Sequence, residues 1–493
     1  MQLLRIHPSD TVAVAIELIE AGTVLPVDGE TVLAKDPIPP GHKIALRNIS
    51  IGEKVIKYGA PIGHATAEIP VGSHVHTHNV KSNLKGRLSY TYTPDFQDLP
   101  PKKPKTFMGY KRADGSVGIR NEVWIIPTVG CVNGIVRQIE MQAQDFKTEN
   151  IDAVTSFCHP YGCSQLGNDR EMTLKYLAGL IRHPNAAAVL VVGLGCENGN
   201  IEELKKVLGT WDEHRVKFLV AQDYEDEISE SLSLLKELCR YADAFRRTEC
   251  SASDLVIGLK CGGSDGFSGI TANPLLGALT DEMIAQGGSA ILTEVPEMFG
   301  AETLLMNRCR TQEQFDKTVS LVNDFKEYFL RYGEKTDENP SPGNKAGGIT
   351  TLEDKSLGCT QKGGSAPVED VLGYGDAVQK KGLSLLQSPG NDLVASGALA
   401  VSGAQLILFT TGRGTPFGCP IPTVKISSNS DLYDRKKAWI DFDAGRLLSG
   451  VSMDELKEEF LEYVLALASG EIRAKSERLD RHDLAIFKDG VTL

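Results

Sequence analysis

Short apolar runs that end in glycine-rich polar loops recur from about residue 110 to the end of the chain. The clearest is the run Leu255–Leu259, which leads into the loop sequence KCGGSDGFSGITANP. Comparable runs lead into VGCVNGI, HPYGCSQLG and GLGCENGN, and helical patterns alternate with them. This alternation predicts parallel βαβ units. The polar loops then gather at the carboxyl ends of the strands, the edge at which open α/β sheets bind ligands.

The first eighty residues follow a different pattern. The segments GHKIAL, GEKVIK and GSHVHT share a Gly-x-x-apolar form, and short strands at such close spacing predict a compact β domain. The pattern resembles the SAF-like β-clip module, which by itself specifies no chemistry. Four prolines between residues 94 and 104 then favour an extended connector.

The expected fold class is therefore a multidomain α/β protein with mainly parallel sheets and a small N-terminal β domain. We expect a SAF-like domain over residues 1–92, a proline-rich linker over 93–107, and two α/β domains over 108–250 and 251–493. Within the last of these, the segment Glu338–Gly364 has little periodicity. Its glycines and charged residues fit a lid or substrate loop about as well as plain disorder.

Composition and charge restrict the possible partners. A chain of 493 residues, 41% hydrophobic and 24% charged, is typical of a globular protein with several domains. Its formal net charge of −13 argues against nucleic-acid binding, which needs a basic face. The apolar run Ala186–Val192 is far too short for a membrane span, and MQLLRIHPSD has no signal-peptide pattern. Ten cysteines without regular close pairing favour a reducing compartment, so we expect a cytoplasmic location and a small-molecule ligand.

Three of the ten histidines lie within five residues, in the sequence HVHTH. On a strand, His74, His76 and His78 would share one face, because side chains alternate between the two faces. Neutral imidazoles on one face can hold a divalent metal or contact a substrate. The alternative is an exposed polar face of a small β domain.

Cysteines stand at the predicted strand ends, at positions 131, 163, 196, 261 and 359. They could be iron–sulfur ligands, but the chain lacks the C-x2-C spacing that is typical of many cluster proteins. A need for small residues in tight turns explains each of them equally well.

Several charged residues near predicted strand ends are candidates for chemistry. In TEVPEMFGAE, Glu294 ends a buried run and so favours a functional role, whereas Glu302 fits a helix cap. Arg413 lies between two glycines, which suits bidentate binding of a carboxylate. Because the chain is acidic, an anionic ligand would need local positive partners, for which Arg120 and Lys345 are further candidates.

Taken together, long segments in order along the chain resemble the altronate and galactarate dehydratase family. They include the following sequences: HVHTHN, YKRADGSVGIRNEVWIIPTVGCVNGI, HPYGCSQLG, HPNAAAVLVVGLGCEN, CGGSDGFSGITANP, LTEVPEMFGAE, ENPSPGNKAGGITTLEDKSLGCTQK, FTTGRGTP and AIFKDGVTL. The resemblance implies an iron(II)-dependent hydro-lyase of hexuronate breakdown, with Mn(II) as a substitute metal. It would convert D-altronate to 2-dehydro-3-deoxy-D-gluconate and water.

In this interpretation each candidate residue has an expected role. The metal ligands are His74, His76 and His78. The catalytic candidates are His76, Glu294, Arg120 and Lys345, and the substrate-binding candidates are Cys163, Cys261, Ser264, Asp265, Asn273 and Arg413.

Two alternatives remain open. One is a related reaction on galactarate or another sugar acid, or a sulfo-lyase reaction. The other, outside the lyases, is a cysteine-ligated iron–sulfur redox protein. Homo-oligomer formation is also left open.

The distribution of these candidates predicts how the domains meet. The clustered histidines belong to the β domain, whereas the glycines, the cysteines and most polar groups belong to the α/β loops. We therefore expect the β domain to dock over the strand ends, with the active site between domains.

Overall fold

The computed structural model describes residues 2–479 and 482–493, and its N-terminal part is a domain of short antiparallel strands. They form a four-stranded sheet in the order β1-β2-β5-β8, a hairpin β3-β4 and a three-stranded sheet β6-β7-β9. The strands are β1 (Leu3–Leu4), β2 (Val12–Ala15), β3 (Val24–Val27), β4 (Glu30–Leu33), β5 (Lys43–Ala45), β6 (Lys54–Lys57), β7 (Ala60–Ala65), β8 (His74–Val75) and β9 (Val80–Lys81). This β domain and the α/β domains after it confirm the expected fold class.

The second domain is built on a parallel sheet of order β13-β12-β14-β15. Its central strand β14 is buried along its whole length because every residue of AAAVLVVG is apolar or glycine. The strands are β12 (Glu122–Pro127), β13 (Val154–Ser156), β14 (Ala186–Gly193) and β15 (Val216–Val220), and the helices are α1 (Asn133–Ala143), α2 (Gly167–Arg182), α3 (Ile201–Leu208) and α4 (Glu227–Asp243).

A small antiparallel sheet joins this domain to the next one. Its strands are β11 (Val117–Gly118), β10 (Thr106–Lys111) and β16 (Thr248–Ser251), with β10 in the middle. The end of the proline-rich stretch is therefore already part of a sheet.

The third domain contains a seven-stranded sheet of order β19-β20-β18-β17-β21-β22-β23, in which all neighbouring strands are parallel. Its strands are β17 (Val256–Cys261), β18 (Ser289–Leu292), β19 (Val368–Leu372), β20 (Gly382–Leu386), β21 (Leu406–Thr411), β22 (Thr423–Ser427) and β23 (Phe442–Asp443). Its helices are α5 (Ala272–Ala285), α6 (Glu302–Met306), α7 (Gln312–Arg331), α8 (Pro342–Ala346), α9 (Leu352–Cys359), α10 (Asp392–Val401), α11 (Ser430–Arg435), α12 (Met453–Ala468) and α13 (Lys475–Arg478). None of the helices among the described residues is both long enough and apolar enough to cross a membrane.

The expectation of an irregular segment over residues 338–364 is wrong. This segment contains α8, α9 and a 3-10 turn over Thr360–Gly363, and α9 is buried at every position. A helix buried on all sides has no apolar stripe. Its charged residues are paired inside the protein, so the sequence shows no helical period.

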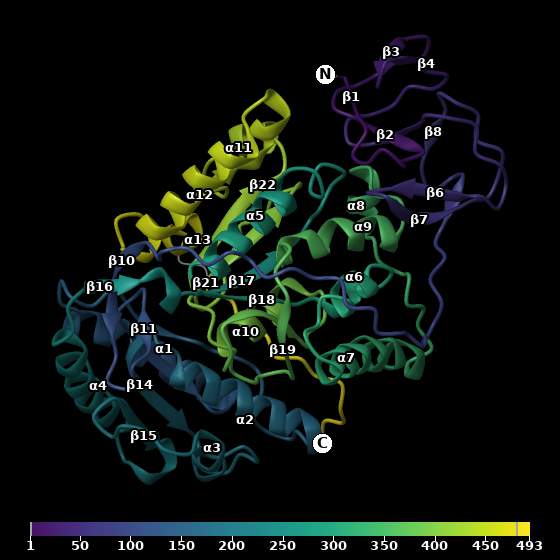
Figure 1. Cartoon of the computed structure of the whole chain (residues 1–493). Helices are drawn as coiled ribbons and strands as arrows, with labels where there is room; N and C mark the ends of the chain where they lie inside the picture. Colours follow the sequence, from purple (N-terminus) through teal and green to yellow (C-terminus); the bar gives the residue numbers. More distant parts are fainter. Residues whose placement is uncertain (1, 480–481) are drawn as a thin grey trace.

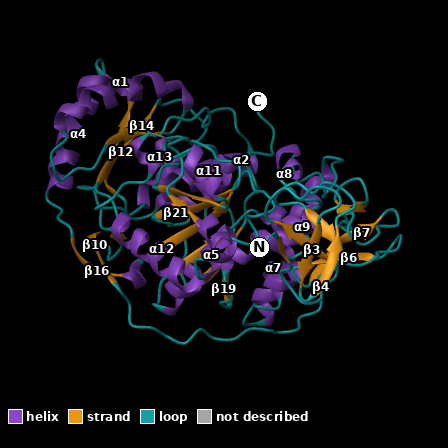
Figure 2. Ribbon diagram, turned by 90° about the horizontal axis from the view of Figure 1, so that it is seen from above, coloured by secondary structure: helices purple, strands orange, loops and turns teal. Residues whose placement is uncertain are grey.

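Two hydrophobic contacts fix how the domains meet. Helices α2 and α10 pack together, and one core extends from Trp124 in the second domain to Phe409 in the third. The core of the first domain includes Ala301 and Leu357 of the third domain. In Figure 1 the first domain, in purple, lies beside α8 and α9, and Figure 2 shows the same neighbourhood from above.

Candidate active site between the first and third domains

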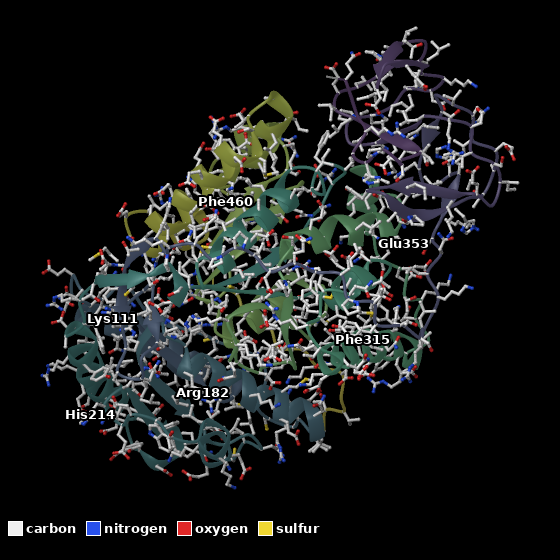
Figure 3. All side chains as sticks on the ribbon, viewed as in Figure 1. Lys111, Arg182, His214, Phe315, Glu353 and Phe460 are labelled. Atoms are coloured by element: carbon white, nitrogen blue, oxygen red, sulfur yellow. The ribbon has the colours of Figure 1, made fainter. Side chains whose placement is uncertain are left out.

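Buried ion pairs attach the first domain to helix α9. Lys43 Nζ and Lys57 Nζ each donate to a different oxygen of the Asp354 carboxylate, both at 2.9 Å. All three side chains are almost completely inaccessible to solvent. The neighbouring Glu353, labelled in Figure 3, accepts from Ser82 Oγ at 3.1 Å, where the chain leaves the first domain. The expected docking of the β domain onto the third domain is confirmed.

Four imidazoles gather on the side of the first domain that faces α8. His74 and His78 have ring centroids 5.3 Å apart, and His74 and His76 are 5.7 Å apart. His42 joins them, because its Nδ1 lies 3.0 Å from His74 Nε2 and its ring lies 4.8 Å from that of His76. Only His74 belongs to a strand, so the three predicted histidines cluster without sharing one strand face.

Contacts with the third domain orient these rings. His42 Nε2 lies 3.3 Å from the carbonyl oxygen of Ala346, and His76 Nδ1 lies 3.1 Å from Thr350 Oγ1. Hydrogen bonds of this kind fix the ring orientation and leave the other nitrogen of His76 for a ligand.

Burial and nearby charge favour the neutral forms of His74 and His76. Burial, together with the charges of His42 and His78, lowers the pKa of His74 to about 4. Burial and the Lys43 ammonium lower the pKa of His76 to about 3. Burial also lowers the pKa of Lys43 to about 8, because the Asp354 carboxylate that it shares with Lys57 only partly compensates. Neutral imidazole is the form that binds metals.

The glycine-rich loop after β17 lies directly against the docked domain. Gly266 N donates to Gly347 O at 2.7 Å, and a Cβ at Gly266 would lie only 2.0 Å from Gly41 O. A side chain at position 266 is therefore excluded by the first domain. In the same loop the buried Ser264 hydroxyl has no hydrogen-bond partner among the described residues. Asp265 instead accepts from several neighbours, including Ser428 Oγ at 2.7 Å, and so holds the loop in shape.

Beneath this loop, a buried cluster of lysines and carboxylates surrounds Glu294. One carboxylate oxygen of Glu294 pairs with Lys260, and the other accepts from Lys362 at 3.2 Å and from the backbone of Cys261 at 3.0 Å. Glu294 has a φ of 69°, a left-handed conformation that costs a non-glycine residue on the order of 1 kcal/mol. This backbone conformation directs the carboxylate toward the ammonium groups of Lys260 and Lys362, and these ion pairs offset the cost.

Two thiols lie in the same cluster. Cys261 Sγ and Cys359 Sγ are 3.5 Å apart, and each donates to the same oxygen of Glu297, at 3.0 and 3.3 Å. Lys355 Nζ donates to the other oxygen of Glu297 at 2.6 Å, and Lys362 Nζ lies 2.8 Å from Cys261 Sγ. Burial alone would raise the pKa of Glu297, but the lysines hold it well below its usual range.

Two groups of side chains are candidate metal ligands: the Cys261, Glu297 and Cys359 group, and the histidine cluster. The ligand atoms of Cys261, Glu297 and Cys359 lie within 4.8 Å of one another. However, Lys362 already binds Cys261 and Lys355 already binds Glu297. The contact with Cys261, together with burial, raises the pKa of the Cys359 thiol well above its usual value. Both effects oppose a divalent cation. The histidine cluster offers imidazole nitrogens, the donor type that suits a divalent transition metal. Within the described residues no ammonium bonds these nitrogens, but no three of them all lie within 4.8 Å of one another, so a metal would have to draw the rings closer together.

Two cations at the site lack internal partners. Lys345 is half-buried in α8, Arg413 is exposed after β21, and among the described residues neither side chain has an ion pair or hydrogen bond. Arg413 borders the glycine-rich loop, since a Cβ at Gly263 would lie 3.2 Å from Arg413 Cβ. Lys345 lies in the short helix followed by Gly347, which contacts Asp265. Both charges are available to an anionic ligand.

The other predicted site residues have different positions. Asn273 is buried at the start of α5, where it donates to Gly358 O at 3.1 Å and accepts from Thr410 Oγ1 at 2.6 Å. The structure does not bring Arg120 or Cys163 to this site. Arg120 is buried in a bidentate pair with Glu477, at 2.7 and 3.0 Å, and Cys163 is exposed beside the four-stranded sheet.

Sequence reasoning missed His42, Lys260, Asp354, Lys355 and Lys362. The pairing of β5 with β8, with Lys43 opposite Val75, brings His42 to the other histidines, and such pairing cannot be found from either segment alone. For the lysines a signal was present. Lys355, Cys359 and Lys362 are spaced by four and three residues, so on a helix they share one face.

Comparisons with known proteins agree along the whole chain. Residues 1–83 match the family model described as "Altronate/galactarate dehydratase SAF domain", residues 109–243 match "D-galactarate dehydratase/Altronate hydrolase, second domain", and residues 252–492 match "D-galactarate/Altronate dehydratase, C-terminal". The chain is 52% identical to altronate dehydratase of Escherichia coli (strain K12), with 100% of both chains covered, and 52% identical to that of Bacillus subtilis (strain 168), with 99% of both covered. It is 33% identical to galactarate dehydratase (L-threo-forming) of Escherichia coli (strain K12), which covers 98% of this chain and 96% of the relative.

Proposed function

Because this chain belongs to the altronate/galactarate dehydratase family, we propose that it is a hydro-lyase that dehydrates D-altronate to 2-dehydro-3-deoxy-D-gluconate. The observation that carries the proposal for the site is the docking of the first domain, which brings neutral imidazoles next to the glycine-rich loop of the third domain. Active sites between domains are common for small ligands.

The substrate carboxylate is assigned to Lys345 and Arg413. Both are cations without an internal partner, and they flank the loop that contains Ser264 and Asp265. Removal of the proton at C2 puts negative charge on the carboxylate oxygens, and fixed positive groups at these oxygens stabilise that charge. The unpartnered hydroxyl of Ser264 is assigned to a substrate hydroxyl.

His74 and His76 would hold the metal together with His42, which takes the place of the expected His78 because it lies beside both rings whereas His78 is exposed. Iron(II) is the proposed identity of the metal and Mn(II) a substitute. The metal would supply Lewis-acid stabilisation of negative charge on substrate oxygens. Thr350 orients His76, and the buried pairs of Lys43 and Lys57 with Asp354 hold the first domain in place. Glu294 is a positioning residue, since both of its oxygens are occupied by buried partners. For Arg120 no part in the reaction is proposed.

The test is a substrate screen of hexonates and hexarates with chelator-treated enzyme, before and after iron(II) is added. We expect water loss from altronate to depend on the added metal. His76→Ala should lower turnover by ~10²-fold or more, the scale of a lost catalytic group, and should lower the iron bound per chain. His64→Ala is the matched control, because His64 lies on β7 of the same domain and bonds Asn83 at 2.8 Å. Faster turnover of a hexarate than of altronate, or unchanged kinetics of His76→Ala, would contradict the proposal.

A further inference from the structure

A second group of candidate ligands lies at the carboxyl edge of the four-stranded sheet. All ten cysteines of the chain are free, and the exposed ones are Cys131, Cys163 and Cys196. They follow β12, β13 and β14, which are neighbours in the sheet. Since neighbouring strands are about 4.8 Å apart, the three loops lie side by side. We call these three residues the cysteine shelf.

Backbone hydrogen bonds join the three loops of the shelf to one another. Gly130 N donates to Tyr161 O at 2.9 Å, which connects the Cys131 loop to the Cys163 loop. Gly199 N donates to Gly162 O at 3.3 Å, and Ser164 N donates to Asn198 Oδ1 at 3.1 Å, which connect the Cys163 loop to the Cys196 loop. The positions of the three cysteines are therefore set by one connected structure.

The residues on either side of Cys163 have left-handed backbone conformations. Gly162 has a φ of 105°, and a Cβ there would lie 2.0 Å from Thr128 O, just after β12. Ser164 has a φ of 60°, which costs a residue other than glycine on the order of 1 kcal/mol. These two backbone conformations hold Cys163 against the loop that contains Cys131.

Polar groups surround the sulfurs without satisfying them. Cys163 Sγ lies 3.8 Å from Ser164 Oγ, and Gln222 Nε2 donates to Cys196 Sγ at 3.9 Å, both of which are long contacts. Two residues after Cys131, the buried Oδ1 of Asn133 has no hydrogen-bond partner among the described residues. Exposed free thiols are a liability in a folded protein, and six of the chain's cysteines are buried instead.

We propose that the cysteine shelf binds an iron–sulfur cluster through three thiolates. A single ion would need the three sulfurs close together. Within the described residues, the three-donor set whose atoms all lie within 4.8 Å of one another is that of Cys261, and it contains no shelf cysteine. In a cluster each thiolate binds a different iron, so the ligands span a wider triangle. Donors such as the Gln222 amide then hydrogen bond to cluster sulfur ligands, which tunes the cluster.

Three thiolates leave one iron of a four-iron cluster without a protein sulfur. Cys158, which also follows β13, is half-buried and contacts Asn133 O of helix α1 at 3.8 Å. The open position could bind a hydroxyl or carboxylate oxygen. The shelf belongs to the second domain, whose strands β14 and β15 lie at lower left in Figure 1, away from the first domain in purple. This inference therefore stands separately from the proposed dehydration site.

The test measures iron and acid-labile sulfide in protein that is purified without oxygen, before and after anaerobic incubation with iron salts, sulfide and dithiothreitol. We expect sulfide to bind with a broad visible absorption band, and each of Cys131→Ser, Cys163→Ser and Cys196→Ser to lose most of it. Cys250→Ser, in β16 and away from the shelf, is the control, because within the described part of the chain the hydrogen bond of the Cys250 thiol is to Thr248 O at 3.4 Å.

Circular dichroism checks that each variant folds. Absence of sulfide from the parent protein would overturn the proposal, as would full sulfide in the three shelf variants. Loss of sulfide in Cys158→Ser as well would overturn the three-thiolate assignment. None of these readouts uses turnover, so failure of the proposed dehydratase activity would leave the result interpretable.

Discussion

The two parallel sheets of the protein end in similar polar loops, but their carboxyl edges differ. The edge of the seven-stranded sheet is covered by the first domain, and the lysines, carboxylates and thiols around Glu294, Glu297 and Asp354 are buried and mutually paired. The edge of the four-stranded sheet is bonded to the C-terminal segment of the chain, at Ser164 and Gln165, but it still presents exposed thiols without strong partners. A covered edge can hold charges in fixed positions because the protein itself compensates them. At an open edge the exposed thiols have no such internal partners among the described residues, so a bound ligand would have to supply them.

The largest effect is expected when the first domain is detached from the edge of the seven-stranded sheet. Asp354→Asn takes away the carboxylate shared by Lys43 and Lys57, which leaves two buried ammonium groups without a counter-charge. We expect the free energy of unfolding to fall by about 3–5 kcal/mol, with loss of dehydratase activity. Chemical denaturation followed by circular dichroism measures the first effect.

Asp376→Asn is the control for Asp354→Asn. Asp376 pairs with Lys175 at 3.5 Å on the exposed surface, where an ion pair contributes little. If both variants unfold at the same denaturant concentration as the parent, the ion pairs of Asp354 do not hold the first domain.

Acid should weaken the junction between the two sheets. His183 ends α2, and its Nε2 lies 2.9 Å from Ala404 O of the third domain. Burial lowers its pKa to about 4, with Arg215 and Arg112 contributing. The unfolded chain therefore binds the proton first as pH falls from about 6.5, the ordinary histidine value. Stability should decrease by about 3 kcal/mol between pH 6.5 and 4 through this residue.

His183→Asn should remove that part of the pH dependence. The measurement is the denaturation midpoint of both proteins at several pH values, and the difference between them isolates His183. A parallel pH dependence in the two proteins would show that this histidine does not titrate between the folded and unfolded states.

The rates at which thiols at the two sheet edges react with a reagent provide a further test of the difference between these edges. In chelator-treated, reduced protein we expect iodoacetamide to label the cysteine shelf at least ~10²-fold faster than Cys261 and Cys359, whose reaction requires local opening of the structure. Peptide mass spectrometry over a time course gives the rates. Equal rates at the two edges would mean that the cover over the seven-stranded sheet is open in solution.

The smallest expected effect concerns the unpaired cation of the covered edge. Lys345→Met should lower kcat/KM for altronate roughly 30-fold, which corresponds to about 2 kcal/mol for a lost hydrogen bond to a charged group. Lys335→Met, at an exposed position in the connection between α7 and α8, is the control. Unchanged kinetics for Lys345→Met would remove this residue from the substrate site.

The architecture could be predicted because it depends on local patterns. The β domain, the parallel sheets and the docking between them follow from strand periodicity and from where polar residues fall. The candidate site was predictable in part. His74, His76, Cys261 and Glu294 stand next to recognisable strand ends, and the structure places His74 beside His76 and Cys261 beside Glu294.

The remaining site residues depend on long-range packing. His42 reaches the site only through strand pairing, and Asp354 becomes a domain anchor only when lysines from 297 and 311 residues away are buried beside it. Arg120 was predicted to be a site residue, but the structure places it elsewhere. Its charge suggested a ligand site, but the fold supplies Glu477 as an internal partner. Sequence alone does not distinguish a cation that is paired inside the protein from one that is left for substrate.

Helix α9 contains three consecutive charged residues whose partners lie in three different places. Glu353 bonds the exit of the first domain, Asp354 bonds Lys43 and Lys57, and Lys355 bonds Glu297. A substitution at Asp354 or Lys355 leaves a buried charge elsewhere without its partner, and one at Glu353 removes the bonds to Ser82 and Asn83. Single substitutions in this turn of α9 are therefore expected to be selected against. Among relatives of diverging sequence, the three positions and their distant partners should be inherited as one unit, retained together or replaced together.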